Sequence, residues 1–200
     1  MKILITAFDP FGGEEVNPAL EAVRALPGEI AGARLVKGEL PTVFGRSREV
    51  LAALVERERP DLVIAVGQAG GRAQVSLERV AINIDDARIP DNEGNQPVDE
   101  PVEPGGPPAL FATLPIKAMV EAIRAAGIPA GVTNSAGTFV CNHLMYGLLF
   151  LLQEEYPGVR GGFIHVPYIP AQVLDCFATP SMSLADIVKA LELAVAAAVK

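Results

Sequence analysis

Hydrophobic and polar positions along the chain follow two periods, one typical of β-strands and one typical of α-helices. Short apolar runs predict strands over residues 2–8, 33–40, 61–67, 75–84, 130–134 and 161–166. Apolar residues spaced three and four apart predict helices over residues 17–28, 45–60, 115–127, 141–155 and 183–200. Because strands and helices follow one another in turn, we expect an α/β fold, a three-layer α/β/α sandwich around a twisted, mostly parallel mixed sheet.

Several elements carry local signals for burial or for where they begin and end. The run "DLVIAVG" at residues 61–67 is continuously apolar, which indicates a strand covered on both faces of the sheet. Asn17 is a good helix cap, Pro18 suits the first helical position, and Gly28 is expected to end that helix. Ser183, with Asp186 three residues later, has the spacing of a capping box.

Length and composition suit one domain spanning residues 1–200, with no linker or internal repeat. The formal net charge of −8 argues against nucleic acid and anionic membrane surfaces as partners. No leader pattern follows Met1, and no apolar run is long enough to span a bilayer, so we expect a cytoplasmic protein. Two cysteines, Cys141 and Cys176, are too few for a disulfide framework or a zinc cluster.

Ligand sites in open α/β sheets lie at the carboxyl ends of the strands. This rule selects the loops "DPFGG", "GQAGGR", "NSAGTFVC" and "HVPYIP", and it predicts that Cys141 and His165 lie at one edge of the sheet. Residues 85–108, rich in Pro, Gly, Asp and Asn, predict a long irregular loop of the kind that is commonly functional or disordered.

Cys141 falls where a small-residue loop gives way to an apolar helix. The free N–H groups and partial positive charge of a helix start favour a thiolate and can also bind an oxyanion. These features make Cys141 a candidate nucleophile. The alternative is a buried cysteine that packs as a small hydrophobic residue.

Two histidines could serve as the base for such a nucleophile. His143 lies two residues past Cys141, and positions i and i+2 of a helix do not face each other, so a packing role in the first turn is favoured. His165 ends a predicted strand and could take the thiol proton. The alternative is that His165 is a core residue whose ring nitrogens are hydrogen-bonded and which has no catalytic role.

A carboxylate is then expected to orient His165. Alternation in "VSLERVAINI" sets Glu78 on the same strand face as Val80, Ile82 and Ile84, where a charge is costly unless it is paired. Pairing with His165 would offset that cost. The alternatives are a glutamate that faces water, or one that pairs with Arg79 or Arg88. Asp85 and Asp86 compete for the role, although turn chemistry explains both.

The glycine-rich loops also raise the possibility of a nucleotide site. Neither "DPFGG" nor "GQAGGR" matches the dinucleotide or P-loop pattern. Phe8 and Phe11 beside the first loop suit a small apolar ligand better than a polyphosphate, and Gln68 supplies both a donor and an acceptor.

Seven segments together resemble the pyroglutamyl-peptidase I family of cysteine peptidases. They are "FDPFGGEEVNPA", "LPTVFGRS", "VIAVGQAGGR", "LERVAINIDDARIPDNEGNQP", "TLPIKAMVEAIRAAGIPA", "NSAGTFVCNHLMYGLL" and "GGFIHVPYIPAQ". The similarity runs in order from residue 3 to about residue 172. The C-terminal helix adds little to it.

The resemblance implies an enzyme that removes an N-terminal pyroglutamate from peptides through a thioester, without a metal or other cofactor. The family's catalytic residues fall on Glu78, Cys141 and His165. Its pyroglutamate pocket falls on Phe8, Phe11, Gln68, Arg88, Ile89, Phe139 and Val140. The resemblance also implies a cytoplasmic homo-oligomer, a tetramer or a dimer, and assigns no role to Cys176.

Three other functions remain open from the residues themselves. The first is another small-amide acyl hydrolase on the same scaffold, with the triad kept and the pocket changed. The second is a nucleotide-binding protein that uses "GQAGGR" as a phosphate cradle. The third is a catalytically inactive interaction module.

Overall fold

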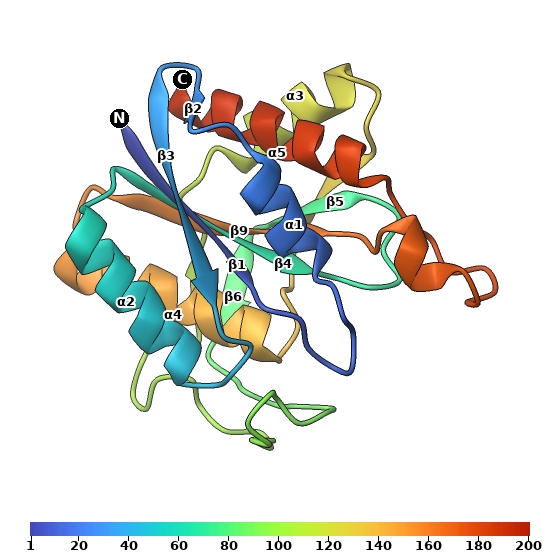
Figure 1. Ribbon diagram of the computed structural model, residues 1–200. Helices are drawn as coiled ribbons and strands as arrows, with labels where there is room; N and C mark the ends of the chain where they lie inside the picture. The colour runs from blue at the N-terminus through green and yellow to red at the C-terminus, as the bar shows by residue number, and fades with distance from the viewer.

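The computed structural model describes residues 1–200 and contains a seven-stranded sheet between two layers of helices (Figure 1). The strands are β1 (Lys2–Phe8), β2 (Glu29–Ile30), β3 (Ala33–Leu40), β4 (Leu62–Gln68), β5 (Val75–Glu78), β6 (Val80–Ile82), β7 (Ala109–Phe111), β8 (Ala130–Thr133) and β9 (Arg160–Val166). The helices are α1 (Pro18–Ala25), α2 (Arg46–Glu58), α3 (Ile116–Ala125), α4 (Val140–Glu155), the 3₁₀ turn η1 (Pro170–Val173) and α5 (Leu184–Val199). The predicted α/β/α sandwich is confirmed.

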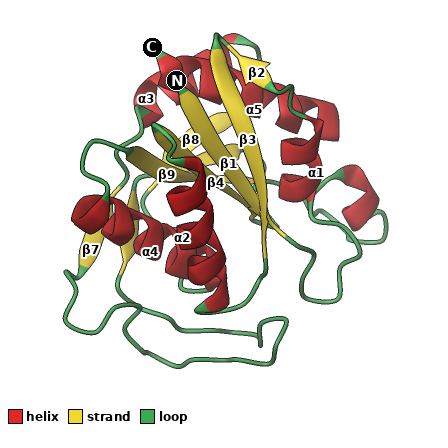
Figure 2. Ribbon diagram, turned by 60° about the vertical axis from the view of Figure 1, so that its left-hand side comes forward, coloured by secondary structure: helices red, strands yellow, loops and turns green.

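The main sheet has the strand order β2-β3-β1-β4-β9-β5-β8. Strands β3, β1, β4 and β9 are parallel and form its centre. Helices α1, α3 and α5 cover one face, and α2 and α4 cover the other (Figure 2). Every residue of β4 is buried, as its continuous apolar run predicts. No helix is both long and apolar enough to cross a membrane.

The helix ends agree in part with the sequence signals. Asn17 caps α1 by accepting a 3.0 Å hydrogen bond from the Ala19 N–H, and Ser183 caps α5 by accepting one from Asp186 at 3.1 Å. Helix α1 ends at Ala25, earlier than the glycine at residue 28, because Pro27 cannot donate the hydrogen bond that would continue it.

Two sequence predictions about strands are wrong. The first is that the strand before the loop "NSAGTFVC" ends at the same edge of the sheet as the strands before the other selected loops. Strand β5 pairs antiparallel with β9, and β8 pairs parallel with β5, so the carboxyl end of β8 lies away from the edge at which β1, β4 and β9 end. The loop "NSAGTFVC" therefore has to lead back to that edge. The run over residues 75–84 is also not one strand. It breaks at Arg79, after which β6 leaves the main sheet and pairs with β7.

Residues 85–108 form the long irregular segment that the composition predicts, and hydrogen bonds hold it in place. Asp85 and Glu100 form an isolated antiparallel bridge with N–O distances of 2.7 and 3.0 Å. The carboxylate of Asp91 accepts hydrogen bonds from the backbone N–H groups of Phe44, Glu93 and Asn95. This anchoring fixes the part of the segment that reaches the cavity described next.

Candidate active site

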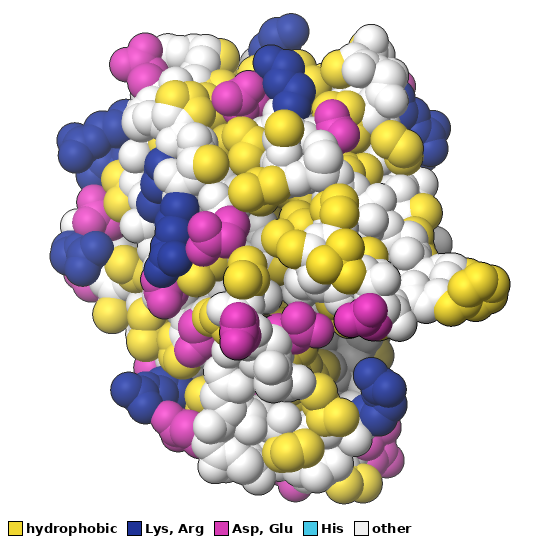
Figure 3. Space-filling model, turned by 45° about the vertical axis from the view of Figure 1, so that its right-hand side comes forward, with side chains coloured by type: hydrophobic (Ala, Val, Ile, Leu, Met, Phe, Trp, Pro, Cys, Tyr) yellow, Lys and Arg dark blue, Asp and Glu magenta, His cyan; other side chains and the backbone are white.

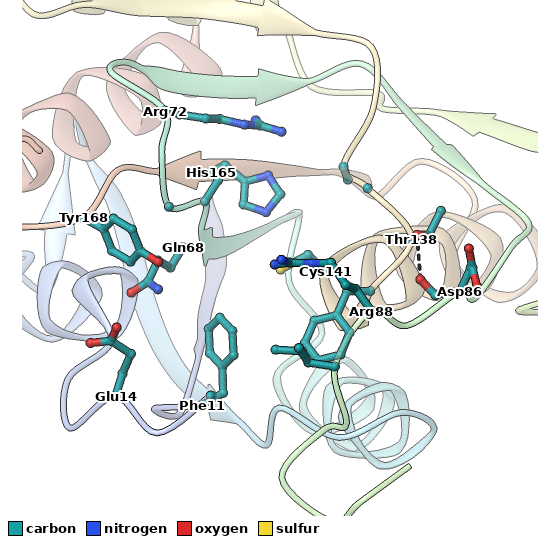
Figure 4. Close-up of a pocket in the computed structure, with 17 residues that line it drawn as sticks. Phe11, Glu14, Gln68, Arg72, Asp86, Arg88, Thr138, Cys141, His165 and Tyr168 are labelled. Atoms are coloured by element: carbon teal, nitrogen blue, oxygen red, sulfur yellow. Dashed lines mark hydrogen bonds between the residues drawn. The ribbon is translucent and has the colours of Figure 1, made fainter. Parts of the chain in front are cut away.

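A cavity of about 530 Å³ opens where β1, β4 and β9 end and α4 begins (Figure 4). Its walls come from loops that are distant in the sequence. The lining residues are Phe11, Gly12, Glu14, Gln68, Ala69, Gly70, Arg72, Asp86, Arg88, Ile89, Ala136, Gly137, Thr138, Phe139, Cys141, His165 and Tyr168. Cys141 and His165 therefore share one cavity, as predicted.

Cys141 is the second residue of α4, at the helix start that the sequence indicates. The N-cap residue is Phe139, whose side chain cannot accept a hydrogen bond, and no side chain caps the helix. The N–H groups of the first turn, including that of Cys141, therefore have no capping partner and can receive an anionic oxygen.

The sulfur of Cys141 lies against the sheet at Gly67. A Cβ atom built on Gly67 would stand 3.0 Å from Cys141 Sγ and 2.8 Å from the ring of Phe163. Gly67 is the register partner of His165 across the β4–β9 pair, so the sulfur and the imidazole occupy adjacent positions over the sheet. Figure 4 shows both side chains at the same cavity.

Burial and the negative charge of Glu78 raise the pKa of the Cys141 thiol to about 12, although the charge of Arg72 acts in the opposite direction. Burial of the sulfur therefore acts against the thiolate that a helix start favours. At neutral pH the sulfur carries a proton that a base has to remove.

His165 is positioned for that step. Its Nδ1 lies 2.8 Å from Glu78 Oε1, and since a carboxylate only accepts, Nδ1 carries the proton and Nε2 of the neutral ring is left as an acceptor. Burial lowers the pKa of His165 below 6.5, although Glu78 acts to raise it and Arg72 adds to the lowering. The imidazole is therefore neutral at pH 7.

Glu78 is fully buried and hydrogen-bonded at both carboxylate oxygens. Oε1 accepts from His165 and, at 2.7 Å, from Nη1 of Arg72, while Oε2 accepts from the hydroxyl of Thr133. Burial acts to raise the pKa of this carboxyl, but the hydrogen bond and charge of His165, with the Thr133 and Arg72 hydrogen bonds, lower it overall. Glu78 is thus an ionised partner of His165, and the predicted contact between them is confirmed.

The other histidine has a packing role, as its position predicts. His143 Nδ1 lies 2.7 Å from Asp85 Oδ2, and its Nε2 accepts a 2.9 Å hydrogen bond from the backbone N–H of Gly45. Both ring nitrogens are used and His143 is buried away from the cavity. Asp85 is therefore committed to His143 and does not orient His165.

The predicted pocket residues divide into two groups. Five line the cavity: Phe11, Gln68, Arg88, Ile89 and Phe139. Phe8 and Val140 do not line it, because both side chains are buried in the core between the sheet and α4. The part of these two residues in substrate binding, which the resemblance implies, stays a prediction. Phe8 packs against Phe163, whose ring centroid lies 4.8 Å from that of His165, so its influence on the site is indirect.

Gln68 is held in one orientation by Gln172, a residue that sequence reasoning did not select. Gln172 Oε1 accepts from the Ile169 N–H at 3.1 Å, so its Nε2 faces Glu14 at 3.2 Å and Gln68 Oε1 at 3.0 Å. With its oxygen engaged by Gln172, the Gln68 amide is left with its N–H donors for a ligand.

Sequence reasoning also gave no place at the cavity to Glu14, Arg72, Thr138 and Tyr168, and it considered Asp86 only as a rival partner for His165. Of these, Arg72 was visible in the sequence as the last residue of "GQAGGR", but nothing in the local pattern ties it to Glu78. The structure contains no group of three or more His, Cys, Asp or Glu side chains arranged to hold a metal ion.

A thiol, an imidazole and a buried carboxylate around one cavity on an α/β sheet are the groups that thiol hydrolases use. The sequence model of the family described as "Pyroglutamyl peptidase" matches residues 1–200. The chain belongs to the pyroglutamyl peptidase family.

Individual relatives agree with this assignment. The chain is 60% identical over 200 residues to the pyrrolidone-carboxylate peptidase of Clostridium botulinum, covering 100% of this chain and 94% of the relative. Among solved structures, Bacillus amyloliquefaciens pyroglutamyl peptidase I superposes with a TM-score of 0.95 at 55% identity, covering 98% and 96% of the two chains. A mutant pyrrolidone carboxyl peptidase of Pyrococcus furiosus gives 0.96 at 44%, covering 100% and 98%.

Proposed function

We propose that this protein hydrolyses the amide bond after an N-terminal pyroglutamyl residue, with Cys141 as nucleophile, His165 as general base and acid, and Glu78 as the group that orients His165. The observation that carries the proposal is the Glu78–His165 contact of 2.8 Å beside a cysteine at the uncapped start of α4. Family membership supports the reaction, and the geometry supports the roles of the residues.

The reaction begins from a neutral thiol and a neutral imidazole. As Cys141 Sγ attacks the carbonyl carbon, Nε2 of His165 takes the thiol proton, and the resulting imidazolium is stabilised by the ionised Glu78. The negative charge that forms on the carbonyl oxygen is received by the N–H groups at the start of α4, with the Arg88 guanidinium as a further candidate donor.

The imidazolium then gives its proton to the leaving amine, and the C–N bond breaks to leave a thioester on Cys141. A water molecule then attacks the thioester carbonyl, and His165 takes a proton from this water. The imidazolium returns that proton to the Cys141 sulfur as the C–S bond breaks. The products are free pyroglutamate and the shortened peptide, with the thiol and the neutral imidazole restored.

The pyroglutamyl ring is a neutral lactam, so its pocket needs an apolar slot and hydrogen-bonding groups, with no counter-charge. The rings of Phe11 and Phe139, whose centroids are 6.2 Å apart, together with Ile89 supply apolar walls. Phe44 supports Phe139 edge-on at a centroid distance of 5.4 Å. The N–H groups of Gln68 match the lactam carbonyl, which proline lacks.

Parallel assays with pyroglutamyl, prolyl and glutamyl arylamides test the proposed substrate. We expect cleavage of the pyroglutamyl compound and about 10⁴-fold less of the prolyl compound, because buried hydrogen-bonding groups reject a ligand that leaves them unpaired. Comparable cleavage of all three compounds by the folded, reduced protein would indicate the alternative function, that of a less selective small-amide acyl hydrolase.

The assembly and location of the protein are further proposals. We propose that residues 1–200 form one domain and that the chain forms a cytoplasmic homo-oligomer, as the resemblance implies. The segment between η1 and α5 projects from the body of the molecule (Figure 1). It exposes the side chains of Leu174 and Phe177, and Phe177 is 100% exposed. An apolar tip of this kind suits self-association. A hydrophobic projection also stands out at the edge of the molecule in Figure 3. Sedimentation equilibrium, with Phe177→Ser as the variant, tests this proposal.

A further inference from the structure

Arg72 connects the turn after β4 to two other parts of the site. Its Nη1 donates to Glu78 Oε1 at 2.7 Å, and its Nη2 donates to the backbone carbonyl of Ser135 at 3.3 Å. The side chain is 31% exposed and lines the cavity, whereas Glu78 is fully buried. Arg72 and His165 are therefore the two cavity-lining side chains that contact the buried carboxylate, and Figure 4 shows both at the cavity.

The guanidinium and the imidazole share one carboxylate oxygen. Both His165 Nδ1 and Arg72 Nη1 approach Oε1 of Glu78, at 2.8 and 2.7 Å, while the Thr133 hydroxyl occupies Oε2. Charge-assisted hydrogen bonds of this type fix a carboxylate in place and offset the cost of its burial. They also draw negative charge away from the oxygen that faces the imidazole.

We infer that Arg72 is a positioning residue for the proposed reaction: it locks the Glu78 carboxylate against His165 and balances its charge, so that His165 stays a neutral base beside Cys141. The inference rests on the proposed roles of these three residues. In this role Arg72 acts through Glu78 and His165 and takes no part in forming or breaking the bonds of the substrate.

Few charged groups lie around His165, so the effect of Arg72 on the titration of His165 can be separated from the effects of the other groups. Glu78 approaches from β5, Arg72 from the turn before it and Cys141 from α4, while the neighbouring position on β4 is the uncharged Gly67. The rest of the cavity adds the titratable or charged residues Glu14, Asp86, Arg88 and Tyr168. The charge of Arg72 lowers the pKa of both His165 and Cys141, and the charge of Glu78 raises both.

Removal of Arg72 leaves the charge of Glu78 unopposed. Both His165 and Cys141 then hold their protons more tightly, so less of the protein has a base able to accept the thiol proton at a given pH. Arg72→Lys keeps the positive charge but loses the planar fork, so it separates charge balance from geometry.

An NMR titration of the histidine ring protons tests the inference without turnover. The chain has two histidines, so a His165→Ala sample identifies the signal of His165. In Arg72→Gln we expect the titration midpoint of His165 to rise by about one pH unit, and in Arg72→Lys to stay near that of the unmodified protein. Arg79→Gln is the matched control, because Arg79 follows Glu78 directly but bonds to Asn134. A midpoint that is unchanged or lower in Arg72→Gln would overturn the inference.

Kinetics supply the second readout. For a pyroglutamyl arylamide we expect kcat at pH 7 to fall about tenfold in Arg72→Gln with KM within about twofold, and Arg72→Lys to recover part of the loss. A raised KM with unchanged kcat would instead make Arg72 a substrate contact. If Arg72→Gln does not fold, Arg72→Lys decides the matter: a severalfold fall in kcat at constant KM supports the inference, and unmodified kcat contradicts it.

The titration also distinguishes a failure of the proposed function from a failure of the role inferred for Arg72. If the unmodified protein fails to cleave the arylamide, the proposed function fails, whereas the shift of His165 in Arg72→Gln still reports whether Arg72 balances the Glu78–His165 pair.

Discussion

The sulfur of Cys141 occupies the space that a side chain on Gly67 would need, since a Cβ atom there would stand 3.0 Å from Sγ. Gly67 lies beside His165 in the register of β4 and β9. Because Gly67 has no side chain, the Cys141 thiol can approach β4 next to the imidazole of His165 on the neighbouring strand β9.

Gly67→Ala should therefore reduce activity by displacing the nucleophile. The added methyl group also meets the Phe163 ring at 2.8 Å, so both the sulfur and that ring have to shift. We expect kcat to fall about 100-fold, the cost of a displacement near 1 Å, with far-UV circular dichroism retained. Gly28→Ala is a control for a general effect of alanine, because no atom lies within 4 Å of the added carbon and Gly28 does not have a positive φ. Unmodified activity in Gly67→Ala would show that the sulfur does not need this position.

The pH dependence of kcat/KM should have one limb, on the acid side. Protonation of His165 removes the base, and its pKa is lowered by burial, so activity should rise with pH through a midpoint below 6.5. Because burial and Glu78 raise the pKa of Cys141 to about 12, no second limb is expected near the ordinary thiol range of about 8.5. Initial rates across buffers from pH 4 to about 10 measure this profile. A clear limb near 8.5 would mean that the thiol titrates normally.

Thiol alkylation should distinguish the two cysteines. Cys176 is exposed and Cys141 is protonated at the base of the cavity, so iodoacetamide at pH 7 should modify Cys176 first and without loss of activity. Loss of activity should follow the slower modification of Cys141, and a pyroglutamate analogue should retard it. Peptide mapping by mass spectrometry against residual activity gives both rates, and Cys176→Ser is the control. Full activity after complete modification of Cys141 would exclude it as the nucleophile.

Local sequence signals predicted the elements of the fold well because each depends on nearby residues. The buried run of β4, the Asn17 cap and the start of α4 at Cys141 are all readable from spacing and residue type. The direction of β5 and β8 was not, because the same alternating pattern suits either direction, and the break at Arg79 depends on the distant partner β7.

The candidate site shows the same division. Glu78 was selected because a lone carboxylate on an apolar strand needs a partner, and His165 does contact it. Phe8 was expected at the cavity because it flanks a loop, but the alternation of β1 turns its side chain into the core. Arg72 lies in the turn before β5 and Gln172 in η1, and no periodicity of the sequence encodes their long-range contacts.

The central claim is that Cys141 is the nucleophile of a pyroglutamyl hydrolase. Hydrolysis of a pyroglutamyl arylamide by the unmodified protein, Cys141→Ser and Cys176→Ser tests it most directly. We predict cleavage by the unmodified protein and by Cys176→Ser, and a loss of roughly 10⁴-fold or more in Cys141→Ser, because the hydroxyl is a weaker nucleophile in a site built around sulfur. Cleavage by a folded Cys141→Ser protein at a rate close to that of the unmodified protein would contradict the claim.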